Sequence, residues 1–127
     1  MKYVLLIHGD EARMTEGRPP DADMSAEFAA YNEALRKSGV MLASERLRPT
    51  SSATSIRVKD GKTELLDGPY AETKEQLGGF YMIDVPDLDQ ALAWAARCPA
   101  ARTGTIEVRP IWPTDGADGT RRGGEGG

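Results

Sequence analysis

The chain has few of the residues on which metal, redox and nucleophilic sites depend. Its 127 residues include one cysteine, Cys98, and one histidine, His8. One cysteine cannot form an internal disulfide, which favours a reduced, cytoplasmic setting. One histidine and one distant cysteine also lack the ligand spacing of a metal site, so we expect no bound metal.

The chain also lacks long apolar runs and an excess of basic residues. No apolar stretch approaches the ~20 residues that span a bilayer, and residues 1–12 lack the layout of a signal peptide. The formal net charge of -4 would repel a phosphate backbone. No glycine-rich loop opens a helix in the manner of a phosphate-binding site. We therefore expect a soluble protein with no cofactor and no direct contact with membranes or nucleic acid.

The apolar residues alternate between the two-residue repeat of strands and the wider spacing of helices. This pattern predicts strands at residues 2–8, 40–47, 77–85 and 105–112, helices at 25–38 and 88–98, and a hairpin of 53–58 with 62–66. Ser25 and Asp87 are the expected N-caps, and Asp60-Gly61 favours a type I′ turn. Residues 1–112 are expected to form one domain, and the glycine-rich residues 113–127 a disordered tail.

The order of these elements predicts an α+β fold, the ferredoxin-like split βαβ arrangement with a β-hairpin elaboration. In that arrangement both helices cover the same face of the sheet. The first strand is nevertheless apolar on both sides, with Tyr3, Leu5 and Ile7 on one and Val4 and Leu6 on the other. The uncovered face is apolar and should be shielded from water. We expect a second subunit to cover it in a homodimer.

Residues 67–75, Asp-Gly-Pro-Tyr-Ala-Glu-Thr-Lys-Glu, combine a turn with a charged loop that leads into an apolar strand. Such loops often carry binding sites. The nine residues resemble the signature of the DGPF (DGPFAETKE) branch of the YCII-related family, with Tyr70 where that family usually has phenylalanine. Residues 1–12 fit the same family, and the resemblance covers residues 1–112.

The resemblance implies a dimeric α/β barrel, in which two sheets pack face to face around paired clefts. It also implies a link to extracytoplasmic-function sigma factors, beside which this branch is often encoded. YCII-related proteins proposed to be enzymes carry a histidine in the first helix and an aspartate before the proline that follows the second helix. Here the corresponding positions hold Phe28, or its neighbour Glu27, and Cys98. The acid-base pair of those relatives is therefore absent.

His8 is the first candidate for site chemistry, because histidine titrates near neutral pH and can act as a general acid or base. Asp10 or Asp67 could orient the imidazole, so His8, Asp10 and Asp67 are the catalytic candidates. The alternatives are that His8 only hydrogen-bonds the neighbouring loop and that Asp67 only accepts turn amides. Cys98 is expected to be structural, because the C-terminal end of a helix disfavours a thiolate.

These residues support two kinds of function. The first is a small-molecule binding or accessory domain whose cleft is lined by His8, Asp67, Tyr70, Glu72 and Tyr81. The two tyrosines could instead pack in the core, and Glu72 could lie in a solvated loop. The second is a cofactor-independent acid-base enzyme, a lyase or isomerase, that uses His8. The missing acid-base pair favours the first hypothesis.

Overall fold

The computed structural model describes residues 1–11 and 20–113. In chain order the elements are β1 (Lys2–Gly9), α2 (Pro20–Ser38), β2 (Met41–Arg46), η1 (Thr50–Ser52), β3 (Thr54–Lys59), β4 (Lys62–Asp67), β5 (Gln76–Asp84), α3 (Leu88–Arg97), η2 (Pro99–Arg102) and β6 (Thr105–Pro110). Each predicted helix and strand is thus found close to its predicted place. Residues 114–127 of the predicted disordered tail lie outside the described residues.

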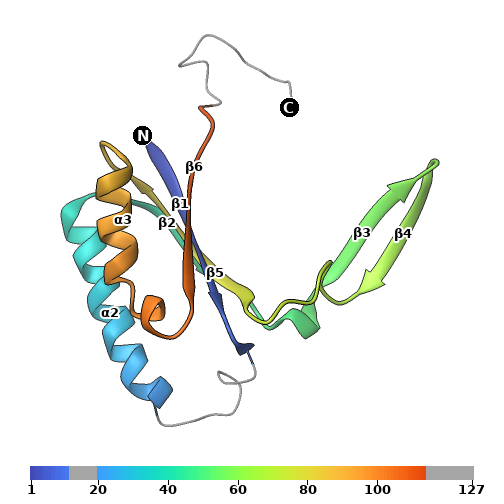
Figure 1. The fold of residues 1–127 in the computed structure, drawn as a ribbon, viewed down its shortest axis with the longest axis horizontal. Helices are drawn as coiled ribbons and strands as arrows, with labels where there is room; N and C mark the ends of the chain where they lie inside the picture. Colours follow the sequence, from blue (N-terminus) through green and yellow to red (C-terminus); the bar gives the residue numbers. More distant parts are fainter. Residues whose placement is uncertain (12–19, 114–127) are drawn as a thin grey trace.

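The strands form a four-stranded antiparallel sheet in the order β2-β5-β1-β6 and a separate ribbon of β3 and β4. Helices α2 and α3 lie on one side of the sheet, and the ribbon projects from the other (Figure 1). Without the ribbon, the order of strands and helices is that of the predicted ferredoxin-like α+β fold. The predicted hairpin is found as this ribbon, and both of its strands stay apart from the sheet.

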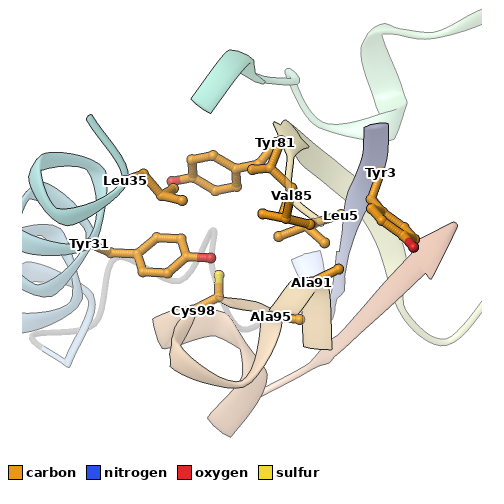
Figure 2. Packing of buried hydrophobic residues seen from close by; sticks show 10 residues of the cluster. Tyr3, Leu5, Tyr31, Leu35, Tyr81, Val85, Ala91, Ala95 and Cys98 are labelled. Atoms are coloured by element: carbon orange, nitrogen blue, oxygen red, sulfur yellow. The ribbon is translucent and has the colours of Figure 1, made fainter. Parts of the chain in front are cut away.

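The core lies between the helices and the sheet (Figure 2). Its buried side chains come from every layer: Tyr3, Leu5, Tyr31, Leu35, Tyr81, Ile83, Val85, Ala91, Ala95 and Cys98. Because side chains alternate across a strand, the residues between these on β1 and β5 face away from the helices. Val4, Leu6, Phe80 and Met82 form this second surface, which we call the open face, and they are half-buried.

Most of the local signals are confirmed. Asp87 caps α3, since its Oδ1 accepts from Gln90 N at 3.0 Å. Asp60 and Gly61 have φ of 51° and 76°, as the predicted type I′ turn requires. The predicted cap Ser25 is wrong, because α2 begins at Pro20 and Ser25 lies inside it. Proline is itself favoured in the first turn of a helix, so the start moves upstream.

Candidate functional site

His8 lies near the end of β1, on the same side of the sheet as Val4 and Leu6. It pairs in the ladder with Thr105 of β6, which places it beside the side chains of that strand. Its Nε2 lies 3.1 Å from Oε1 of Glu107. A carboxylate only accepts hydrogen bonds, so the imidazole donates through Nε2.

Glu107 also binds a second partner on its own strand. Arg109 Nε donates to Glu107 Oε2 at 2.7 Å. This hydrogen bond, followed by the one from His8, lowers the pKa of the Glu107 carboxyl below its ordinary value. We call the three residues the His8 cluster: an imidazole, an ionised carboxylate and a guanidinium on one surface.

The His8 cluster borders the apolar part of the open face. Leu6 lies between Phe80 and Glu107 in the ladder, so one surface carries an aromatic ring, an aliphatic side chain and the charged groups. The Arg109 side chain is 67% exposed. Apolar area with a few polar groups at its edge is the composition of most small-molecule sites.

The lowered pKa of Glu107 has a testable consequence for stability. A carboxyl with a depressed pKa in the folded state stabilises that state above its ordinary pKa of 4.5, and the contribution is lost as pH falls through the depressed value. Glu107→Gln should therefore lower the melting temperature at pH 7, and the gap should close below pH 4.5. Glu72→Gln, on the exposed loop, is the control. A gap that is unchanged at pH 3 would contradict the assigned hydrogen bonds.

The structure gives His8 a different carboxylate partner from the two expected. Asp10 follows directly after β1 and is half-buried, whereas Asp67 is exposed at the end of β4 in the ribbon. The turn after Asp67 is closed by the bonds from Gly68 N to the Ala53 carbonyl O, 2.7 Å, and from Ser55 Oγ to the Gly68 carbonyl O, 2.9 Å. Within residues 1–11 and 20–113, no hydrogen bond to the Asp67 carboxylate is found.

Tyr70 and Glu72 lie in the loop between β4 and β5, and both are exposed. Tyr70 is 76% exposed, and the Arg57 guanidinium lies 5.8 Å from its ring centre. No contact found in the described ranges joins either residue to the His8 cluster. These two predicted ligand-binding residues are therefore accessible, but they stand at the base of the ribbon rather than beside Glu107.

The end of the same loop ties three segments together. Gln76 Oε1 accepts from Glu11 N at 2.9 Å, and the Glu11 carboxylate accepts from Thr50 N and Oγ1 at 2.8 and 2.7 Å. Gln76 Nε2 in turn donates to the Thr73 carbonyl O. This junction joins the end of β1 to both segments that connect the ribbon to the sheet. Gln76, the residue directly after the signature loop, therefore has a structural role, and the Thr73 carbonyl of the loop helps to hold it.

Tyr81 lies on the opposite side of the sheet from the His8 cluster, so it does not line a common site with His8. It is 5% exposed, and its ring meets that of Tyr31 edge-on with centres 5.3 Å apart (Figure 2). Its hydroxyl donates to Asn32 Oδ1 at 2.5 Å. Burial raises the pKa of Tyr81 to about 12. The structure therefore favours a role for Tyr81 in core packing over one in ligand binding.

The positions where relatives were expected to carry an acid-base pair lie within α2 and directly after α3. Cys98 is 1% exposed, and burial raises the pKa of its thiol. This agrees with a structural thiol rather than a nucleophile. Glu27 forms an ion pair with Arg102 and lines an open hollow of about 250 Å³ with Ala30, Tyr31, Arg97 and Pro99.

The described residues were also searched for groups of metal ligands and for membrane-spanning helices. In the part of the chain that the structure describes, no three His, Cys, Asp or Glu side chains are grouped as a metal would require. None of the helices described is both long and apolar enough to cross a membrane.

Sequence reasoning missed Glu107 and Arg109. Both alternate with apolar residues along the last strand, and an ion pair on a solvated strand would give the same pattern. Glu107 and Arg109 lie beside His8 only because β6 pairs with β1. The split βαβ order implies this pairing. That order, combined with the two-residue repeat, would have placed Glu107 on the same face as His8.

Comparison with known proteins agrees with the sequence resemblance. The model of the YCII-related domain matches residues 1–115. An uncharacterized protein of Rhizobium meliloti (strain 1021) is 38% identical over 114 residues, 87% of this chain and 92% of that protein. A solved structure of 5-chloro-2-hydroxyhydroquinone dehydrochlorinase from Burkholderia phenoliruptrix AC1100 is 14% identical with a TM-score of 0.49, over 90% of this chain and 95% of that one. From the family match and the relative together, this chain belongs to the YCII-related family.

Proposed function

We propose that this chain is a small, dimeric, cytoplasmic ligand-binding or accessory domain, and that its site is the open face around the His8 cluster. The observation that carries the proposal is the 3.1 Å contact of His8 Nε2 with Glu107 Oε1, on the face opposite α2 and α3 (Figure 1). The ligand is a small organic molecule that contacts Phe80 and Leu6 with its apolar part.

The charged groups of the cluster suit such a ligand. Glu107 is held by His8 and Arg109, so its position is fixed before a ligand arrives. The exposed guanidinium of Arg109 can bind a planar acidic group through two hydrogen bonds. His8 can donate or accept, depending on its protonation. Asp67, Tyr70 and Glu72 would contribute from the base of the ribbon.

A second copy on the open face would complete the site. It would remove water from Val4, Leu6, Phe80 and Met82, and charged contacts are stronger where water is excluded. The homodimer thereby links the fold to the function. The signature at residues 67–75 further supports the DGPF branch and, through it, a regulatory or accessory role in an extracytoplasmic-function sigma-factor system.

A cofactor-independent acid-base enzyme, of the lyase or isomerase type, is the second candidate. The hydrogen bond between His8 and Glu107 favours it, because a carboxylate that orients an imidazole is a common arrangement in general acid-base catalysis. Asp10 and Asp67 remain the other candidate carboxylates. The binding role stays first, because Phe28 and Cys98 replace the acid-base pair of the relatives proposed to be enzymes.

A thermal-shift screen with small acids, amines and phenols tests the binding role. A ligand at 100 times its Kd stabilises the folded state by about 2.7 kcal/mol, which raises the melting temperature by several degrees. We expect hits for the wild type to be lost in His8→Gln and kept in Glu64→Gln, whose carboxylate lies on the ribbon. Equal shifts in His8→Gln would overturn the site. Chromatography with mass spectrometry of the recovered ligand separates the two candidates, since a lyase changes the ligand's mass and an isomerase its retention, whereas a binding domain returns it unchanged.

A further inference from the structure

We infer that the ribbon of β3 and β4, residues 54–67, is an arm that packs against a second copy of this chain. The inference rests on the homodimer of the proposed function and adds a contact that the sheet faces do not supply. The arm is paired only with itself, and it leaves the sheet on the side opposite the helices (Figure 1). A second copy seated on the open face would therefore lie on the same side as the arm.

The arm has one apolar side with no cover. In the ladder Ile56 lies opposite Leu65 and Val58 opposite Thr63, so these side chains share one side of the ribbon. Ile56, Val58 and Leu65 are 66%, 65% and 69% exposed. The alternating residues make the other side mostly polar: it carries Arg57, Lys59, Lys62 and Glu64, with Leu66, 54% exposed, as its one large apolar side chain. A ribbon with one apolar and one mostly polar side can pack its apolar side against another protein surface.

The other described segments leave that apolar side exposed. Within the described residues, the ribbon strands pair with no other strand. Residues 12–19 contain Met14 as their one large apolar side chain, and residues 114–127 contain none. An isolated two-stranded ribbon is marginally stable in water, and packing of one side against another surface stabilises it. The cover must therefore come from outside the chain.

The area that a dimer needs favours a second copy as that cover. Four strands about 4.8 Å apart and about 20 Å long give the open face roughly 400 Å². A stable interface buries about 800 Å² on each partner, twice that figure. One side of the arm adds roughly 200 Å², and in a two-fold dimer each copy both gives and receives an arm. The exchanged arms thus supply the missing half.

Removing the apolar contact should weaken the dimer without unfolding the monomer, because the substituted side chains are exposed. Ile56→Ser with Leu65→Ser is compared with Arg57→Ser and Glu64→Ser, a cross-strand pair on the polar side with no change in net charge. Sedimentation across a dilution series should show dimer dissociation at least about a hundredfold weaker for the apolar pair, since four buried side chains are lost per dimer. Circular dichroism of each variant checks the fold.

A direct test uses the two lysines beside the turn of the arm. Wild-type protein labelled with 14N and with 15N is mixed, allowed to exchange subunits and treated with a lysine-reactive cross-linker. We expect cross-links of mixed isotope from Lys59 or Lys62 to Lys2, Lys37 or Lys74 of the other copy. Arm cross-links of one isotope only, or an unchanged dimer of the apolar variant, would overturn the arm while leaving the dimer intact. A monomeric wild type would overturn both.

Discussion

Gly104→Ala is expected to destabilise the protein by at least about 1–3 kcal/mol, because a methyl group there overpacks against backbone. A Cβ on Gly104 would collide with the carbonyl O of His8 and would lie 3.2 Å from Gly9 Cα. Backbone atoms inside a paired strand cannot move aside as the end of a side chain can. The collision falls on the strand pair that brings His8 to Glu107, so the substitution should also weaken that hydrogen bond.

Urea denaturation of Gly104→Ala and Gly78→Ala measures the expected loss of folding stability. Gly78 is the matched control, since the nearest atom to its Cβ would be the Ile7 carbonyl O at an ordinary 3.9 Å. We expect the midpoint to fall clearly for Gly104→Ala and much less for Gly78→Ala. Equal midpoints would mean that the end of β1 and the start of β6 are further apart than described.

Leu5→Ala should cost about 2–5 kcal/mol of the free energy of unfolding, the range for a buried leucine in a core. Leu5 is completely buried and lies between Tyr81 and Val108 in the ladder of the central strand. Truncation of this side chain leaves a cavity in the core cluster. Leu92→Ala, at a side chain 46% exposed on α3, should cost far less and serves as the control. Similar losses for both variants would contradict the assignment of the core to this side of the sheet.

Much of the fold could be predicted because its signals are local. Tyr31 and Leu35 are one helical turn apart and both are buried, and Asp60-Gly61 has the backbone that its composition favours. The burial of side chains on α3 could not be predicted in the same way. Ala91 and Ala95 are buried, whereas Leu88 is 48% exposed, because small residues let α3 approach the sheet closely.

The candidate site could be predicted only in part, because its contacts join distant segments. His8 and Glu107 are 99 residues apart, and the carboxylates considered first were those nearer in the chain or in the signature loop. Tyr81 was placed in a cleft with His8 because its phenol group could contact a ligand. The register sets it beside Leu5, on the side that the helices cover. A strand's side-chain repeat fixes which residues share a face, but packing decides which face is covered.

Nuclear magnetic resonance of the His8 imidazole tests the central claim most directly, since His8 is the only histidine and its ring signals need no assignment. Fragments that bind the wild type, drawn from small acids, amines and phenols, are added in steps. We predict that they shift the His8 Cε1–H signal and the Arg109 Nε–H signal together, and that Glu107→Gln uncouples the two. Fragments that bind and shift other signals, while both of these stay at their free positions, would contradict a ligand site on the open face.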